Sequence, residues 1–170
     1  MTATNLVPAF DGGWGHAHGP FDLKVPATLS DLSSVIDRQS IADAIGCYSW
    51  SVDEQQWEVM AEIYTEDMTF SGCVAGVTNL ETVTGSADFI EWLKGFLGAR
   101  DDQLRHSLVN IVVTEQGLDS ATALGYCVLA STTPAGANVQ ATGIYRFSLV
   151  KQGDRWRISA IYGGFDNAPF

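Results

Sequence analysis

Four long strand-like segments fill the C-terminal part of the chain and constrain its fold more than any other feature. The turns between them contain glycine, often with aspartate or proline, which are the residues that tight reversals require. Consecutive strands joined by such short turns pair antiparallel, so the sequence predicts an antiparallel meander. The predicted strands are residues 103–115, 120–132, 138–151 and 155–165.

The preceding part of the chain has a helical period instead. Apolar residues at i, i+3, i+4 and i+7 predict a first helix from about Ser30 to Tyr48. A second helix is expected to begin at Ser51, because Ser51 and Glu54 match a capping box, and to end at Tyr64. The two apolar stripes are Ile41, Ala44, Ile45 and Tyr48, then Trp57, Met60, Ala61 and Tyr64.

Two further segments complete the predicted architecture. Residues 67–84 are expected to form short strands, and Ser86 is expected to cap a third helix. Helices first and a long antiparallel meander last predict an α+β fold, with the helices packed on one face of the sheet. Residues 30–170 are predicted to be one domain. Residues 1–29 are rich in glycine and proline, and their apolar side chains favour an extended arm docked on that domain.

Composition excludes several classes of partner. Twenty acidic residues against nine basic ones give a formal charge of −11, which repels nucleic acids and anionic membrane surfaces. Three separated cysteines without a CxxC pair are typical of free thiols in a reducing compartment. Neither a signal peptide nor an apolar run long enough to span a membrane is evident, so a cytoplasmic protein is expected.

Three residues with acid–base chemistry occur in a distinctive order. Tyr48 precedes Asp53 by five residues, and Arg105-His106-x3-Asn110 follows on a predicted strand. Tyrosine, aspartate and histidine are residue types that transfer protons near neutral pH. Alternation along the strand predicts that His106, Leu108 and Asn110 share one face.

With these motifs the chain resembles the SnoaL-like branch of the NTF2-like superfamily over roughly residues 30–165. Further matching segments are Tyr64-Thr-Glu-Asp67, Phe89-Ile-Glu-Trp92, Gly143-Ile-Tyr145 and Asp154-Arg-Trp156-Arg-Ile158. The resemblance implies a cone-shaped α+β fold in which a curved sheet and helices enclose an apolar cavity. Such families include dehydratases, polyketide cyclases and isomerases that work without a metal or organic cofactor, and also binding modules that catalyse nothing.

The resemblance and the residue chemistry together indicate a candidate active site. His106 is the expected general acid or base, Asp53 is expected to orient it, and Tyr48 is expected to polarise a carbonyl or leaving hydroxyl. Each residue also has a simpler explanation. His106 would be a histidine of the core, Asp53 would be favoured by the helix dipole, and Tyr48 would be buried against the sheet. The expected substrate-binding residues are Tyr64, Trp57, Asn110, Tyr126 and Tyr145.

The expected function is a cofactor-independent dehydratase or cyclase acting on a hydrophobic polycyclic or polyketide-like molecule. A non-catalytic ligand-binding module and the β-subunit of a ring-hydroxylating dioxygenase are the alternatives. His16 and His18 share a face of an extended segment, but no third ligand is evident, so no metal site is expected. A homodimer or homotrimer is expected to form through the outer face of the sheet, with Val113, Val128 and Ile144 as contacts.

Overall fold

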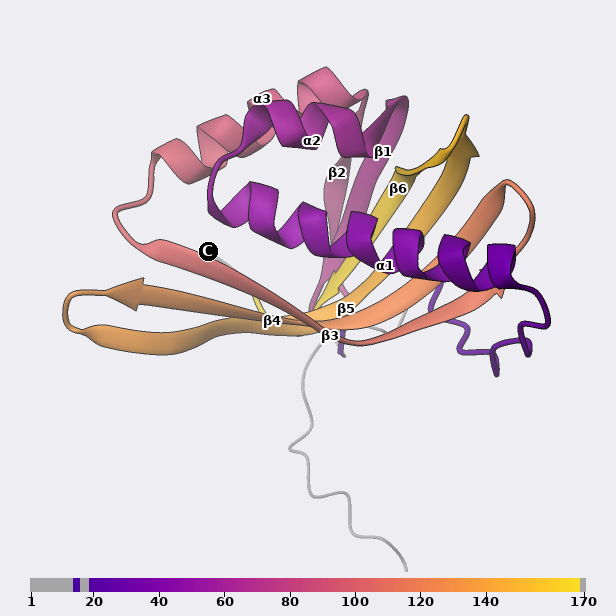
Figure 1. The fold of residues 1–170 in the computed structure, drawn as a ribbon. Coiled ribbons are helices and arrows are strands. Elements are labelled where there is room, and N and C mark those ends of the chain that lie inside the picture. Colours follow the sequence, from indigo (N-terminus) through magenta and orange to yellow (C-terminus); the bar gives the residue numbers. More distant parts are fainter. Residues whose placement is uncertain (1–13, 16–18, 169–170) are drawn as a thin grey trace, which may run out of the picture.

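The computed structural model describes residues 14–15 and 19–168, and it confirms the predicted α+β architecture. Three helices lie on one side of a curved, unclosed sheet of six strands (Figure 1). The helices are α1 (Leu32–Asp53), α2 (Trp57–Ile63) and α3 (Ser86–Gly98). The strands are β1 (Tyr64–Val74), β2 (Thr78–Thr84), β3 (Gln103–Gln116), β4 (Ser120–Thr133), β5 (Gly136–Gln152) and β6 (Arg155–Phe165).

The strand order combines an antiparallel meander with one parallel pairing. The order is β2-β1-β6-β5-β4-β3, so the meander β3 to β6 is antiparallel throughout, as predicted. Strand β1 joins β6 in parallel, a pairing that the sequence did not reveal. Gly153, with φ 66°, permits the tight turn between β5 and β6. Strand β3 is one edge of the sheet, and its neighbours in space are β4 and the end of α1.

Helix α1 is longer than predicted. Asp31 caps its N-terminus by accepting a 2.9 Å hydrogen bond from the Ser34 N–H, and the predicted apolar stripe is buried against the sheet. The helix continues past Tyr48 to Asp53, so the predicted capping box at Ser51 is wrong. Ser51 is fully buried inside α1, where its hydroxyl donates to the Tyr48 carbonyl.

The other helix starts also differ from expectation. Helix α2 begins only at Trp57, after Gln55 has left the helix with φ 52°. Tyr64 is not its last residue but the first residue of β1. Helix α3 has Gly85 at its N-cap, so Ser86 is its first helical residue and not its cap.

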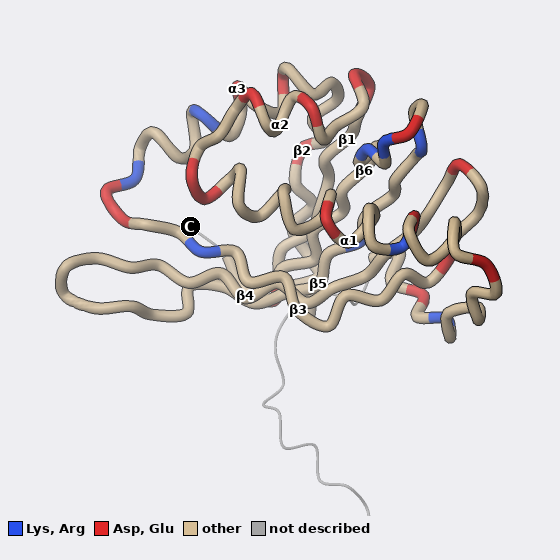
Figure 2. Tube along the Cα trace, viewed as in Figure 1, with Lys and Arg blue, Asp and Glu red and all other residues tan. Residues whose placement is uncertain are grey.

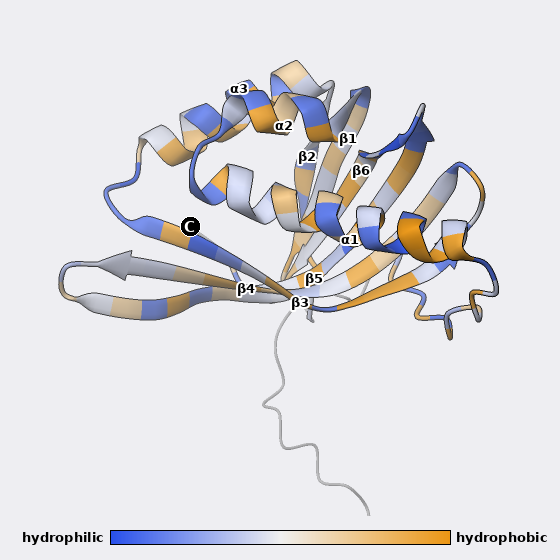
Figure 3. Cartoon of the chain, viewed as in Figure 1, coloured by the Kyte–Doolittle hydropathy of each residue, from blue (hydrophilic) through white to orange (hydrophobic). Residues whose placement is uncertain are grey.

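The interior between helices and sheet is apolar. Figure 3 shows hydrophobic residues along the strands where they pass under α1, and Figure 2 shows charged residues mainly on helices and turns. Strand β4, near the middle of the meander, contains no Lys, Arg, Asp or Glu. The arm residues that the structure describes dock on the body, because the Gly15 N–H donates to Asp166 and Phe21 packs edge-to-face on Tyr162.

Candidate active site

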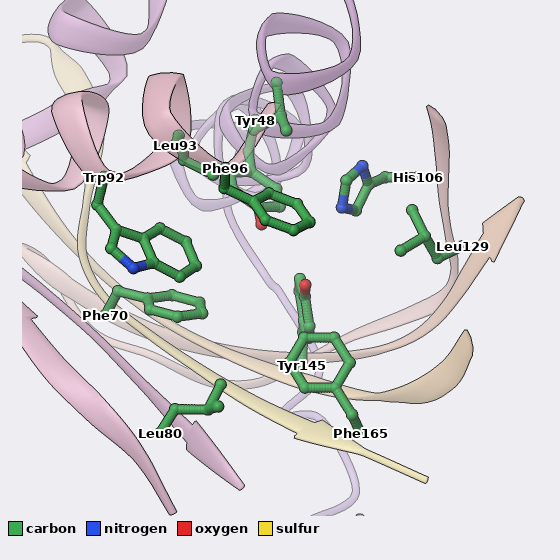
Figure 4. Close-up of a pocket in the computed structure, with 11 residues that line it drawn as sticks. Tyr48, Phe70, Leu80, Trp92, Leu93, Phe96, His106, Leu129, Tyr145 and Phe165 are labelled. Carbon is green, nitrogen blue, oxygen red and sulfur yellow. The ribbon is translucent and has the colours of Figure 1, made fainter. Parts of the chain in front are cut away.

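An apolar cavity lies between α1, α3 and the sheet (Figure 4). Its volume is about 40 Å³, which suits one or two water molecules but is far below the several hundred Å³ of a typical ligand site. A larger ligand therefore has to displace side chains. The lining residues are Tyr48, Val52, Phe70, Leu80, Trp92, Leu93, Phe96, His106, Leu129, Tyr145 and Phe165.

His106 and Asp53 form a tightly bonded pair at the edge of this cavity. The Nδ1 atom of His106 lies 2.6 Å from Asp53 Oδ1, and the His106 backbone N–H donates to Asp53 Oδ2 at 2.7 Å. Their side chains are only 9% and 7% exposed. The predicted hydrogen bond between these residues is confirmed. In a neutral imidazole whose Nδ1 donates to this carboxylate, Nε2 is the acceptor on the ring that lines the cavity.

Asp53 reaches this position because α1 is longer than the sequence indicated. It is the last residue of α1, not an early residue of the next helix. A carboxylate at a helix C-terminus faces the negative end of the macrodipole, so the dipole does not favour it there. The dipole explanation considered for Asp53 therefore does not apply. Its hydrogen bonds to His106 stabilise the carboxylate instead.

Two further contacts fix the end of α1 against the edge strand β3. Gln103 donates a 2.9 Å hydrogen bond to the backbone carbonyl of Asp53. Arg105 forms an ion pair with Glu54 at 2.9 Å. These contacts hold together two segments that are fifty residues apart in sequence. They keep the Asp53 carboxylate next to the His106 imidazole independently of the hydrogen bonds between those two residues.

Tyr48 and Tyr145 supply two hydroxyls near the imidazole. Both are almost fully buried, their ring centroids are 6.0 Å apart, and Figure 4 shows their hydroxyls turned toward each other. Tyr48 also packs edge-to-face on His106, at 6.2 Å between centroids. Burial is the main cause that raises the pKa of Tyr48 and of Tyr145 above their usual value, so both remain neutral hydrogen-bond donors.

Cys127 lies behind this tyrosine pair. Its thiol takes part in a hydrogen bond with the Tyr145 side chain, and burial raises the pKa of Cys127 to about 12. A thiol with such a pKa is protonated at neutral pH and is a poor nucleophile. Cys127 therefore supports Tyr145 and does not suggest covalent catalysis.

Four of the five predicted substrate-binding residues are outside the cavity lining, and Tyr64 and Trp57 are two of them. Tyr64 is 1% exposed and packs edge-to-face on Phe89 in the core. Trp57 is half-buried at the start of α2, where the Lys94 ammonium lies 5.7 Å from its ring centroid. Only Tyr145, of the five residues expected to bind substrate, lines the cavity.

Asn110 and Tyr126 lie on the opposite side of the sheet, and their placement in the cavity was wrong. A β-bulge interrupts β3 between Val109 and Val112, and Asn110 occupies it with φ 53°. The bulge breaks the strict alternation that had placed Asn110 beside His106. Asn110 and Tyr126 instead line an outer groove with Phe21 of the arm.

Helix α3 and strand β1 form an aromatic wall beside the cavity. Phe70, Phe89, Trp92 and Phe96 succeed one another with interplanar angles of 14–33° and centroid separations of 5.0–6.0 Å. The i, i+3, i+7 spacing of Phe89, Trp92 and Phe96 could have revealed one aromatic helix face. Its position over the cavity depends on how α3 packs, which that spacing does not specify.

Metal and membrane features were also considered over the described ranges. No group of three His, Cys, Asp or Glu side chains converges there in a way that could hold a metal ion. His16 and His18 lie outside the described residues. Within those ranges, no helix has the length and hydropathy needed to cross a membrane.

Comparison with known proteins agrees with this architecture. The profile of the SnoaL-like domain family matches residues 33–162. Rv3472, a protein of unknown function from Mycobacterium tuberculosis, is 25% identical, with 80% of this chain and 75% of that chain covered and a TM-score of 0.67. No curated protein matches the sequence.

Two solved structures from Novosphingobium aromaticivorans share the fold at lower identity. One is an NTF2-like protein with a cystatin-like fold: 21% identity, 80% and 90% coverage, TM-score 0.65. The other is a candidate β subunit of an aromatic-ring-hydroxylating dioxygenase: 15% identity, 80% and 93% coverage, TM-score 0.68. At these identities the likeness concerns the fold alone.

Proposed function

The chain belongs to the SnoaL-like domain family, and from this premise we propose that it is a cofactor-independent acid–base enzyme, a dehydratase or cyclase, for a hydrophobic small molecule. The observation that carries the proposal is the buried Asp53–His106 pair, whose imidazole borders an apolar cavity. A histidine needed only for packing would not require a carboxylate that contacts both its ring and its backbone N–H.

The proposed roles follow from the hydrogen bonds. His106 Nε2 removes a proton from a carbon next to a substrate carbonyl, and Asp53 stabilises the imidazolium that forms. The neutral hydroxyls of Tyr48 and Tyr145 donate hydrogen bonds to the carbonyl oxygen, where negative charge develops. In a dehydration, the imidazolium then returns its proton to the departing hydroxyl, so a double bond and water are formed and the base is regenerated.

The lining of the cavity supports the proposed substrate class. Beyond His106 and the two tyrosines, the lining residues are aliphatic or aromatic, and none is charged. A neutral molecule with a hydrophobic ring system and one or two oxygen atoms at one end fits these properties. Polycyclic and polyketide-like compounds are of this kind, and an anionic ligand would find no lining cation to pair with.

A ligand-binding or assembly module is the second candidate. The small cavity favours the assembly role in particular, because it has no space for a polycyclic ligand unless side chains move. Similarity to a candidate dioxygenase subunit is compatible with an assembly role, although it concerns the fold alone.

The experiment that separates these candidates uses a panel of neutral aromatic hydroxyketones. Compounds that bind are first identified by the rise in melting temperature of the wild-type protein. Each one is then incubated with wild-type and His106→Ala protein, and mass spectrometry follows loss of water or formation of an isomer. Conversion that requires His106 supports the enzyme. Binding to both proteins without conversion supports the binding module.

A further inference from the structure

Two aromatic side chains of α3 separate the apolar cavity from solvent. Trp92 and Phe96 both line the cavity (Figure 4), and Trp92 is 39% exposed, more than any other lining residue. Phe96, one turn further along the helix, is half-buried. Most of the other lining residues are buried. The wall of the cavity is therefore least buried where α3 ends.

The last turn of α3, residues 95–98, contains two glycines that flank Phe96. A Cβ atom on Gly95 or Gly98 would meet no neighbouring atom within 4 Å, and neither residue has a positive φ. Packing and backbone conformation therefore do not require glycine at these positions. Compared with alanine, one glycine lowers the population of the helical state by about twofold to fivefold. The turn that carries Phe96 is thus easier to unwind than a turn with alanine in these places.

A hydrogen-bonded cluster ties the segment after α3 to the hairpin of β4 and β5. Arg100 donates from Nε and Nη2 to the two carboxylate oxygens of Asp102, at 2.7 and 2.6 Å, and from Nη2 to Gln140 on β5 at 2.8 Å. Asp102 also accepts a hydrogen bond from the hydroxyl of Ser131 on β4. The Arg100 and Asp102 side chains are only 15% and 8% exposed. We call these four residues the Arg100 cluster.

The Arg100 cluster also holds Phe96 in place. The guanidinium carbon of Arg100 lies 5.7 Å from the centroid of the Phe96 ring, within the range of a cation–π contact. Trp92 stacks on the same ring at 6.0 Å between centroids. Leu97, in the same turn, is buried in the core. Side-chain contacts thus stabilise a turn that its two glycines weaken.

We propose that residues 95–98 form a lid over the apolar cavity, which the Arg100 cluster keeps closed and which admits a hydrophobic ligand when it opens. Opening unwinds the last turn of α3, so that Phe96 leaves the cavity wall and the space enlarges. Gly95 and Gly98 make this local unfolding less costly, and the hydrogen bonds of Arg100 make it rarer. That a hydrophobic ligand enters there rests on the proposed function, but the opening itself can be measured without any substrate.

A thiol in the cavity wall reports the opening. Leu129→Cys places one there, and peptide mass spectrometry follows its reaction with iodoacetamide, a small neutral reagent. When the lid recloses faster than the reagent reacts, the labelling rate is proportional to the population of the open state. Cys73 is buried outside the cavity lining, so its labelling reports global unfolding. The introduced thiol is expected to react faster than Cys73, because the lid exposes it alone.

Gly95→Ala, made in the Leu129→Cys protein, should slow labelling of the cavity thiol about twofold to fivefold. Gly46→Ala is the matched control. Gly46 is also a helical glycine whose Cβ would meet nothing within 4 Å, but it lies on α1 outside the cavity lining. This control is expected to leave labelling of the cavity thiol unchanged. It therefore separates a general gain in helix stability from an effect on the lid.

Arg100→Met should have the opposite effect. It keeps the aliphatic part of the side chain but removes the hydrogen bonds to Asp102 and Gln140, so labelling should become at least about tenfold faster. Arg155→Met is the control, because the ion pair of Arg155 with Glu62 is exposed, and it should change nothing.

Two outcomes would overturn the lid: a cavity thiol that reacts no faster than Cys73, or labelling rates that neither Gly95→Ala nor Arg100→Met changes. If Leu129→Cys does not fold, Val52→Cys places the thiol in the cavity wall from α1 and serves for the same comparisons. A protein that shows the expected labelling but converts no compound would support the lid and contradict only the proposed enzyme.

Discussion

The carboxylate of Asp53 contacts His106 at two atoms: one oxygen accepts the backbone N–H at 2.7 Å, and the other lies 2.6 Å from Nδ1. The last residue of a helix thus fixes both the main chain and the ring of a residue on the sheet edge. Because β3 has no further strand beyond it, this N–H would otherwise have no strand partner. Positioning of the imidazole and protection of the strand edge are accomplished by one side chain.

Replacement of His106 tests its role as the base. His106→Ala should lower turnover by at least ~10²-fold, since general acid–base catalysis contributes in that range. His106→Gln is the matched variant, because it restores polar volume but cannot accept a proton. Both should remain folded by circular dichroism. A folded His106→Ala protein with wild-type turnover would contradict the proposed mechanism.

Asp53→Asn should reduce both stability and turnover. Hydrogen bonds to a charged group contribute roughly 1.5–3 kcal/mol, and the amide loses the charge while retaining one acceptor. Urea denaturation should therefore show a lower free energy of unfolding. Glu54→Gln is the neighbouring control, because its ion pair with Arg105 is exposed and such pairs are worth only about 0–1 kcal/mol. Equal losses of unfolding free energy in the two variants would mean that the buried Asp53–His106 pair stabilises the protein no more than the exposed ion pair does.

The two cavity tyrosines should contribute less than His106. Tyr48→Phe and Tyr145→Phe each remove one hydroxyl, a loss of about 0.5–1.5 kcal/mol, or roughly threefold to tenfold in rate. The double variant should lose more than the sum of the single losses, because the two hydroxyls face each other and either can partly replace the other. Steady-state kinetics of the wild type, the two single variants and the double variant form a double-mutant cycle. Strictly additive losses of activation free energy would show that the two hydroxyls act independently.

Alkaline pH should destabilise the protein through its buried tyrosines and Cys127. Burial raises the pKa of Tyr48, Tyr64 and Tyr145 above 10, and that of Cys127 from 9.0 to about 12. Above the unfolded pKa values the unfolded state binds fewer protons, so the free energy of unfolding falls as pH rises. For Cys127 the fall covers about pH 9 to 12. Urea denaturation at several pH values checks this, and Cys127→Ala should remove part of the slope.

The last prediction is that the protein self-associates through the outer face of the sheet. Tyr126 is 51% exposed there, and Ile144 pairs with it across β4 and β5, so both can contribute to a contact between copies. Val113 cannot, because it is buried in the core, contrary to the sequence-based expectation. Sedimentation at micromolar concentration should show a dimer or trimer, and Tyr126→Arg should shift it toward monomer. A wild-type monomer of 18.3 kDa would contradict the expectation.

The strands were the part of the fold most easily predicted. Glycine turns and alternating burial define β3 to β6 locally, and the predicted boundaries agree with the structure within two residues. Helix ends were harder, because Ser51 and Glu54 match a capping pattern that the longer α1 overrides. The physical reason is tertiary: Val52, next to Asp53, is buried against the core, and Asp53 is bonded to β3.

Residue order and periodicity by themselves determined the fold class, and the resemblance carried by the sequence motifs predicted the family and the pairing of Asp53 with His106. Only the tertiary structure decided which side chains share the cavity. A single bulge at Asn110 moved that residue to the outer face, and the packing of α3 brought Trp92 and Phe96 over the site. Burial and facing depend on contacts between segments far apart in the chain, which local periodicity does not encode.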